Sequence, residues 1–341
     1  MNPDTPAGRQ AGDTTAQNPT MRAIIQDRYG SAEVLRPARV PRPVVADDQV
    51  LVQVHAAGLD RGTEHLLTGK PYAVRLAMGM RRPKNPVPGR DVAGTVIDVG
   101  ADVVGLEPGD EVYGVAPGSF AEYAVTTADK LARKPAGLSF AQAAVVPISG
   151  GTALQALDVG RLQSGQSVIV TGASGGVGSY AVQIARALGA EVTGVCSPAK
   201  ADHVRALGAH HVLTYPDDDW TDGTRRWDLV LDIAGNPTVR QLRRALTPRG
   251  TAVFVGGEDA GAVLGMARQV RGAMVSPFVG QRLVPLLSRE RAEHYERLTE
   301  LIDAGHVSPA LDRTYPLEQA ADAMRQLERG EVRGKVAITV R

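Results

Sequence analysis

A cluster of four glycines within eight residues constrains the fold of this chain more than any other feature of its sequence. The run is Thr171-Gly172-Ala173-Ser174-Gly175-Gly176-Val177-Gly178. It follows an apolar, strand-like stretch at 167–171 and precedes a segment, 177–188, whose apolar residues recur with helical spacing. Glycines in this setting allow a sharp turn, a close approach of the backbone to a pyrophosphate, and tight packing of the helix on the strand. The pattern predicts a dinucleotide-binding turn; the alternative is an ordinary tight turn without a ligand.

Strand-like and helical segments alternate from about residue 150 onward. This alternation is typical of a doubly wound parallel sheet, so we expect an α/β domain around the glycine cluster. The expected strands are 167–171, 191–195, 211–214, 228–233 and 251–255, with a sixth at 273–279, and the expected helices are 177–188, 199–207 and 238–246.

The region before the glycine cluster has a different pattern. Residues 21–147 contain short alternating apolar stretches separated by Gly and Pro turns about ten residues apart, which favours a small antiparallel barrel or sandwich. The expected strands there are 49–57, 91–99, 111–115 and 120–126. After two helices near 290–304 and 317–329, a last strand at 335–340 needs a sheet to join, and we expect it to return to this first domain.

Composition limits the classes of function. A length of 341 residues predicts about two domains, and a net charge of +1 provides no overall field for binding nucleic acid or a membrane surface. The single cysteine, Cys196, cannot form an internal disulfide or a zinc site that needs two thiolates. Residues 1–20 are polar and predict a disordered tail, and no stretch has the length and apolarity to cross a bilayer. We therefore expect a cytoplasmic protein.

The segment after the second strand of the parallel sheet predicts which cofactor binds. Proteins that prefer NAD carry an acidic residue there for the ribose hydroxyl, whereas this chain has Val195-Cys196-Ser197-Pro198. Ser197 can donate a hydrogen bond and Lys200 supplies a positive charge, and both suit a 2'-phosphate. We therefore expect NADP(H). The alternative is that Ser197 only caps a helix and Lys200 is a solvated lysine of its first turn.

Six motifs in order give the chain a resemblance to a known family. They are Pro88-Gly89-Arg90-Asp91-Val92-Ala93-Gly94, Pro108-Gly109-Asp110-Glu111-Val112, Phe120-Ala121-Glu122-Tyr123, Gly151-Thr152-Ala153, the glycine cluster, and Arg333-Gly334-Lys335-Val336. From residue 21 to 341 the chain resembles the medium-chain dehydrogenase/reductase superfamily, specifically its zinc-free quinone oxidoreductase-like branch. The resemblance implies a Rossmann domain, 148–287, inserted in a GroES-like β-rich catalytic domain made of 21–147 and 288–341. It also implies an active site in the cleft between them and a homodimer.

The resemblance places the family's catalytic zinc ligands on residues that do not match them. The corresponding positions are Asp60, Arg90 followed by Asp91, and Ile148 or Ser149. An arginine does not ligate zinc. We therefore expect no metal, and we expect Asp60 and Arg90 to pair with each other in its place. The alternative is two separate, solvated charges.

A site without a Lewis acid favours acceptors that delocalise their own negative charge, such as quinones and α,β-unsaturated carbonyls. The family's proton-donating tyrosine falls on His65, with Tyr72 as a second candidate. A histidine can donate a proton near neutral pH. His65 could equally be a packed residue of a helix.

Further positions in the Rossmann domain follow from the resemblance alone. Thr152 resembles a residue that holds the cofactor, Tyr215 resembles a contact to the adenosine phosphate, and Val255 and Gly256 lie where the sheet passes under the nicotinamide. The alternative for Tyr215 is that it only caps a strand. Together these features predict an NADPH-dependent, zinc-independent reductase of a small-molecule quinone or enone. The open alternatives are a biosynthetic enoyl reductase and a weakly catalytic NADPH-sensing or RNA-binding protein.

Overall fold

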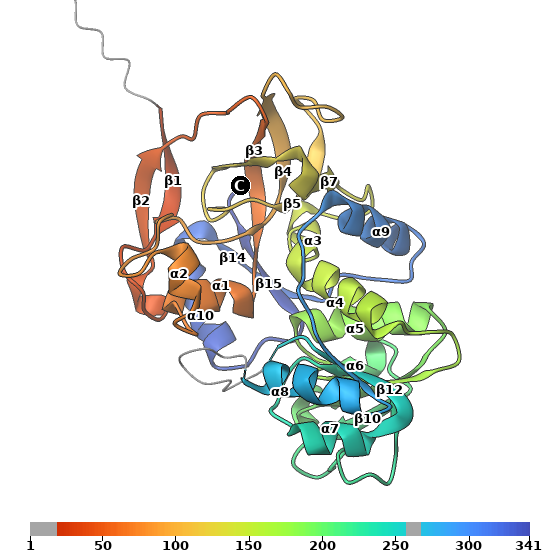
Figure 1. The fold of residues 1–341 in the computed structure, drawn as a ribbon. Helices are drawn as coiled ribbons and strands as arrows, with labels where there is room; N and C mark the ends of the chain where they lie inside the picture. Colours follow the sequence, from red (N-terminus) through yellow and green to blue (C-terminus); the bar gives the residue numbers. More distant parts are fainter. Residues whose placement is uncertain (1–18, 257–266) are drawn as a thin grey trace, which may run out of the picture.

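The computed structural model describes residues 19–256 and 267–341, whose strands form three β-sheets of two, six and seven strands. Figure 1 shows the seven-stranded sheet in the upper half of the molecule and the six-stranded sheet, with its helices, in the lower half. Residues 1–18 of the predicted tail, 1–20, lie outside the described residues. Thr20, which was assigned to the tail, is the first residue of strand β1 and pairs with Pro41.

The six-stranded sheet is parallel throughout, with the order β10-β9-β8-β11-β12-β13. Its strands are β8 (Ser167–Thr171), β9 (Glu191–Cys196), β10 (His211–Thr214), β11 (Trp227–Asp232), β12 (Leu246–Phe254) and β13 (Arg282–Pro285). Its helices are α4 (Pro147–Gly160), α5 (Gly176–Ala187), α6 (Ala201–Ala206), α7 (Val239–Ala245) and α8 (Ala267–Val275). The predicted doubly wound sheet is confirmed.

The sixth strand of this sheet was predicted at the wrong place. Residues 273–279 belong to the end of α8 and to the 3₁₀ turn η4 (Ser276–Phe278), and the strand is β13. Val275 packs against the cluster around Phe254, whereas Met274 and Phe278 are exposed, so the apolar run that suggested a strand is the end of a helix that packs on one side only. β13 has only four residues, which is too short for an alternation of apolar and polar residues to be recognised in the sequence.

The seven-stranded sheet has the order β14-β15-β3-β4-β5-β7, with β6 paired to β3. Its strands are β3 (Gln49–Leu59), β4 (Asp91–Val99), β5 (Glu111–Val115), β6 (Tyr123–Thr127), β7 (Leu131–Arg133), β14 (Leu311–Pro316) and β15 (Lys335–Thr339). The last strand pairs antiparallel with β3, placing Val336 opposite Leu59. This confirms that the end of the chain returns to the first sheet.

The remaining elements include a third, two-stranded sheet, in which β1 pairs antiparallel with β2. They are β1 (Thr20–Ile25), β2 (Arg36–Pro41), α1 (Arg61–Thr68), α2 (Val74–Met78), α3 (Phe140–Ala143), α9 (Ala292–Asp303), α10 (Ala320–Glu328), and the 3₁₀ turns η1 (Ala32–Val34), η2 (Ala128–Lys130), η3 (Pro198–Lys200) and η5 (Leu317–Gln319).

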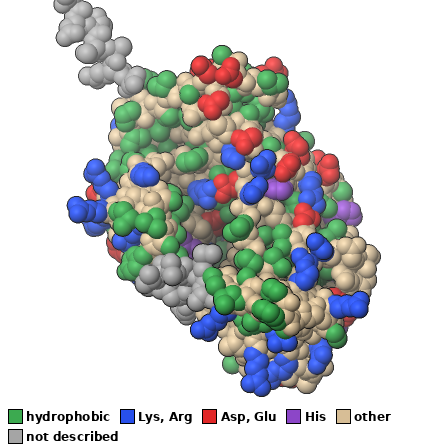
Figure 2. All heavy atoms as spheres, in the orientation of Figure 1, with side chains coloured by type: hydrophobic (Ala, Val, Ile, Leu, Met, Phe, Trp, Pro, Cys, Tyr) green, Lys and Arg blue, Asp and Glu red, His purple; other side chains and the backbone are tan. Residues whose placement is uncertain are grey.

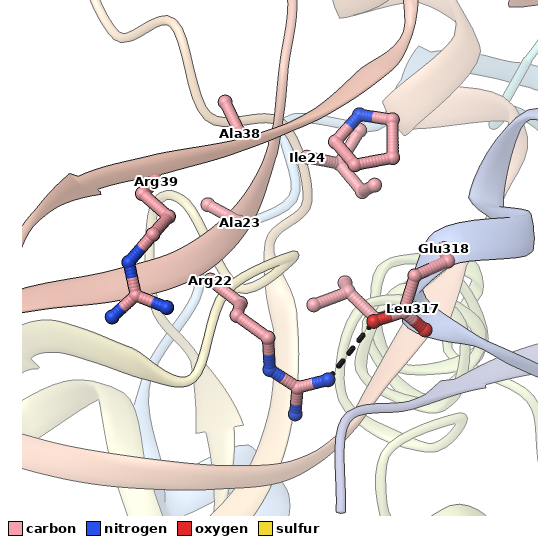
Figure 3. A pocket seen from close by; sticks show the side chains of 8 residues that line it. Arg22, Ala23, Ile24, Ala38, Arg39, Leu317 and Glu318 are labelled. Atoms are coloured by element: carbon pink, nitrogen blue, oxygen red, sulfur yellow. Dashed lines mark hydrogen bonds and ion pairs between the residues drawn. The ribbon is translucent and has the colours of Figure 1, made fainter.

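A pocket lies between β1, β2 and η5 (Figure 3). Its charged side chains already have partners: Arg22 forms ion pairs with Glu122 and Glu318, and Arg39 donates to Thr20. The pocket therefore offers no unpaired charge to a ligand, and the candidate site is elsewhere.

One buried apolar cluster contains residues of both larger sheets. Tyr180 of α5 and Val168 of β8 belong to the same buried cluster as Ala56 of β3 and Tyr113 of β5. The Tyr180 hydroxyl donates to the carbonyl of Val145 at 3.0 Å. Burial of this apolar surface therefore holds the two larger sheets together.

Candidate active site

The glycine turn between β8 and α5 has the geometry that the sequence predicts for a dinucleotide site. Gly172 has a φ of +67°, and a Cβ there would lie 2.7 Å from that of Ala234. A Cβ on Gly178 would lie 2.1 Å from the carbonyl oxygen of Gly172, so only glycine lets the helix pack this closely. At Gly175 a Cβ would meet its nearest neighbour at 3.4 Å, an ordinary contact. Gly172 and Gly178 are therefore required by the fold itself, whereas Gly175 is not.

The N-terminus of α5 has the features of an anion site. Within the described part of the chain, no side chain caps this helix at Gly175. Its first N–H groups and its dipole therefore favour a phosphate. Ala173 and Ser174 are buried in the turn, and the carbonyl of Ser174 accepts a hydrogen bond from the N–H of Gly334 at 2.8 Å. The turn thus touches the segment that leads into β15.

The residues predicted to select NADP(H) lie at the carboxyl end of β9. Ser197 precedes η3, and its side chain makes no capping bond to the described residues. Lys200 donates from Nζ to the carbonyls of Gly330 and Val332, at 2.8 Å each, and burial lowers its pKa. It is therefore not the freely solvated lysine of the alternative interpretation. Tyr215, just after β10, is 57% exposed.

The other predicted cofactor positions lie on α4 and just after β12. Thr152 lies on α4, with its hydroxyl 3.4 Å from that of Ser288. The N–H groups of Val255 and Gly256 donate to the carbonyl of Asp232, which ends β11. Val255 and Gly256 follow the carboxyl end of β12, and doubly wound sheets bind ligands at the carboxyl ends of their strands.

The carboxyl group of Asp232 is buried beneath this edge. Arg268 of α8 lies 2.9 Å from its Oδ2. Burial raises the pKa of Asp232 to about 7, and the charge of Arg268 opposes the shift. Sequence analysis did not single out this carboxyl group.

The predicted pair between Asp60 and Arg90 is wrong. Arg90 forms an ion pair with Glu290, whereas Asp60 lies 3.3 Å from the ammonium of Lys335. The alternative of a solvated Asp60 also fails, because this residue is 8% exposed. The reason for the difference is that β15 brings another cation, the buried Lys335, to Asp60, while Glu290 provides an anion for Arg90.

Lys335 instead bridges two carboxylates in the interior. Its Nζ lies 3.0 Å from Oδ2 of Asp91 and 3.3 Å from Oδ2 of Asp60. Each carboxylate also accepts from a helix: Oδ1 of Asp60 from the N–H of Thr63 at 2.7 Å, and Oδ1 of Asp91 from the N–H of Ile148 at 2.8 Å. We call Lys335, Asp60 and Asp91 the buried triad.

Burial and mutual attraction set the protonation of the buried triad. For Asp60, burial alone would raise the pKa, but Lys335 and Thr63 outweigh it and hold the pKa below its usual range. For Asp91, burial and the charge of Asp60 raise the pKa to about 6 against the pull of Lys335. Burial opposes the charge of Lys335, yet the two carboxylates raise its pKa.

The buried triad bears directly on the zinc question. The matching positions supply Asp60 and Asp91, whose oxygens are held by an ammonium and by N–H groups, and Arg90, whose guanidinium is held by Glu290. Over residues 19–256 and 267–341, no cluster of three or more His, Cys, Asp or Glu side chains has the arrangement of a metal site. The residues present do not fit a zinc ion.

The two candidate proton donors both have exposed side chains. His65 is exposed on α1, the helix that Asp60 caps. Tyr72 is 44% exposed, and Arg75 stacks over its ring at 4.8 Å. Figure 2 shows that the surface on this side is hollowed between the two halves of the molecule. The alternative of a packed histidine is not what the structure shows.

Sequence analysis missed two partners in this region. Lys335 was noted only as part of a motif, although a lysine at the start of an apolar strand is a signal of a buried ion pair. Glu290 gave no signal, because it pairs with Arg90 from 200 residues away.

Comparisons with known proteins define the family. Residues 46–136 match the alcohol dehydrogenase GroES-like domain, and residues 207–338 match the family described as zinc-binding dehydrogenase. The chain belongs to the quinone oxidoreductase-like medium-chain dehydrogenase/reductases, a family of oxidoreductases that use nicotinamide cofactors.

Individual relatives are similar along nearly the whole chain. The mouse protein "NAD(P)H oxidoreductase RTN4IP1, mitochondrial" is 31% identical over 98% of this chain and 93% of its own length. The tomato (Solanum lycopersicum) "2-methylene-furan-3-one reductase" is 32% identical over 93% of this chain and 79% of its own. The crystal structure of Escherichia coli quinone oxidoreductase complexed with NADPH superimposes with a TM-score of 0.80 at 26% identity, over 94% of this chain and all of that one.

The described residues also bear on membranes. None of the helices in 19–256 and 267–341 combines the length and the apolarity that crossing a bilayer requires.

Proposed function

We propose that this protein is an NADPH-dependent, zinc-independent oxidoreductase that reduces quinones or α,β-unsaturated carbonyls. The observation that carries the proposal is the glycine turn. The fold requires glycine at positions 172 and 178, whereas it does not require glycine at 175, where the missing side chain leaves the backbone accessible to a pyrophosphate. The named activities of the relatives agree, since one is a quinone oxidoreductase and another reduces a conjugated furanone.

The residues around the turn are suited to hold NADPH. The first N–H groups of α5 suit the pyrophosphate, and Ser197 and Lys200 provide a hydroxyl and a cation at the place of the 2'-phosphate. Thr152, Tyr215, Val255 and Gly256 complete the proposed contacts. When bound, the cofactor supplies the hydride.

The protein then has to supply a proton and a hydrogen bond to the acceptor's oxygen. Adding a hydride to a quinone or an enone leaves a delocalised oxyanion, which takes up one proton to complete a two-electron reduction. His65, which is exposed on α1, is our first candidate for that proton and Tyr72 the second. Because the charge is delocalised in the acceptor, hydrogen bonds can stabilise it without a Lewis acid.

Three further assignments remain part of this proposal. They are the domain limits 21–147 with 288–341 and 148–287, a homodimer, and a cytoplasmic location. The continuous return of β15 to β3 supports the discontinuous domain. Exposed Val270, Met274 and Phe278 beside β13 provide an apolar face for a second copy.

Initial-rate assays with NADPH and with NADH, against a panel of quinones and enals, test the proposed function. We expect turnover with NADPH, and a kcat/KM at least about ten-fold lower with NADH because of the missing 2'-phosphate contacts. Equal use of the two cofactors would overturn the cofactor assignment. Tight NADPH binding without turnover on any acceptor would favour a sensing protein.

A further inference from the structure

The buried triad has no part in the chemistry described so far, although it holds three ionisable groups in the interior. Lys335 is 1% exposed and Asp91 1%, so neither contacts an acceptor from the cleft. Replacing a buried ion triad by apolar residues is often neutral or stabilising, so stability alone does not explain why such a group is present. The charges can instead fix the relative positions of the backbone segments that carry them.

Each member of the buried triad is tied to a different helix beginning. Asp60 caps α1, the helix of His65, through the N–H of Thr63. Asp91 accepts the N–H of Ile148 at the start of α4, the helix of Thr152.

The third tie leads to the glycine turn. A Cβ built on Gly176, the first residue of α5, would lie 2.9 Å from Cδ of Lys335, so the lysine stem lies against the turn. The Lys335 side chain is therefore linked to three helix N-termini: its ammonium to α1 and α4 through the two carboxylates, and its stem to α5 by direct packing.

We propose that Lys335 is a positioning residue that fixes the N-termini of α1 and α4 relative to the glycine turn, and so aligns the acceptor side of the cleft with the cofactor. This inference rests on the proposed function. Its physical basis is that hydride transfer depends steeply on alignment, where a displacement of about 1 Å can cost about 100-fold in rate. An ammonium shared by two carboxylates restricts such a displacement more than apolar packing does, because its hydrogen bonds are directional.

The same geometry predicts a pH dependence. The groups around Asp91 are Lys335 from β15, Asp60 between β3 and α1, Tyr180 from α5 and Tyr295 from α9. As the pH falls through about 6, Asp91 gains a proton and its attraction to Lys335 weakens. Hydride transfer should therefore slow as the pH falls through this value.

Two variants and one control test the proposal. Lys335→Met removes the ammonium, and Asp91→Asn keeps the shape of the protonated carboxyl at every pH. Lys134→Met is the control, because Lys134 is also nearly buried and ion-paired, with Glu111, but lies outside the buried triad. Single-turnover rates with NADPH and its deuterated form, NADPH dissociation constants, and hydrogen exchange at Thr63 and Ile148 are measured from pH 5 to 8.

We expect Lys335→Met to slow hydride transfer by about 10- to 100-fold, to change NADPH affinity by less than about threefold, and to speed exchange at both amides. Asp91→Asn should transfer hydride slowly at pH 8, and its rate should not decline further as the pH falls through about 6. Should Lys335→Met not fold, the pH profile of Asp91→Asn decides alone.

The positioning role would be overturned if Lys335→Met kept the wild-type rate of hydride transfer and the wild-type amide exchange, or if Asp91→Asn kept the wild-type pH profile. Either result would leave the proposed function intact. Losses of the same size in Lys134→Met would also overturn it. A wild-type protein without hydride transfer to any acceptor would overturn the proposed function and this inference with it.

Discussion

Lys200 shows how one residue can serve the fold and the cofactor together. It ties η3 to the segment before β15 through two carbonyls, at the position where a 2'-phosphate is expected. We predict that Lys200→Ala raises the dissociation constant of NADPH by about 10- to 100-fold, since a hydrogen bond to a charged group contributes about 1.5–3 kcal/mol. The value for NADH should change little.

Fluorescence titration with both cofactors measures this difference, and a thermal melt shows whether the lost carbonyl contacts affect folding. Lys70→Ala, at an exposed lysine of the other domain, is the control. An equal loss for NADPH and NADH would show that Lys200 does not read the phosphate.

Asp232 gives a prediction about stability and pH. Its pKa is about 7 in the folded protein and its ordinary value is 3.8, so between these values the folded state binds a proton that the unfolded state releases. Stability therefore falls as the pH rises through this window, by up to about 1.4 kcal/mol per pH unit. Asp232→Asn cannot ionise and should lose this part of the slope.

Urea unfolding of the wild type and of Asp232→Asn at pH 5, 6, 7 and 8 measures the effect. The comparison isolates Asp232, because Asp91, whose pKa is also raised, is present in both proteins. Parallel stability curves would mean that Asp232 is ionised throughout this range.

At the scale of elements, the glycine turn separates a folding role from a binding role. Gly175 has a φ of −89°, which any residue adopts, and its Cβ would meet only an ordinary contact. We predict that Gly175→Ala changes the free energy of unfolding by less than about 1 kcal/mol and weakens NADPH binding at least about tenfold, because the methyl group takes the space of the pyrophosphate.

Gly178→Ala is the matched opposite, since its Cβ would lie 2.1 Å from the carbonyl oxygen of Gly172. It should destabilise the fold by about 1–3 kcal/mol. Gly137→Ala, where a Cβ would meet nothing within 4 Å, is the control. Unchanged NADPH affinity in Gly175→Ala would place the cofactor elsewhere.

The elements were predictable where local periodicity decides the structure. The strand, turn and helix from 167 to 188 could be derived from the sequence, because apolar spacing and glycines act within a few residues. The strand at 273–279 was mispredicted, because a short apolar run does not by itself distinguish a strand from the end of a helix. The pairs of Asp60 with Lys335 and of Arg90 with Glu290 could not be derived, since the fold brings together residues 275 and 200 positions apart.

At the scale of the whole molecule, the apolar face of Val270, Met274 and Phe278 predicts self-association. Light scattering should give the mass of two chains, because exposed side chains of this size favour burial against a partner. Met274→Glu, which places a charge on that face, should shift the protein toward one chain. A single-chain mass for the wild type at micromolar concentration would contradict the homodimer.

The central claim is that NADPH binds across the glycine turn and that its hydride passes to a conjugated acceptor without a metal ion. The most direct measurement follows deuterium from NADPH labelled at C4 of the nicotinamide into an enone, using chelator-treated protein whose metal content is measured alongside. We predict one deuterium per molecule of reduced enone, at the same rate before and after chelation. Transfer that stops on chelation and returns with added zinc, or an unlabelled product, would contradict the claim.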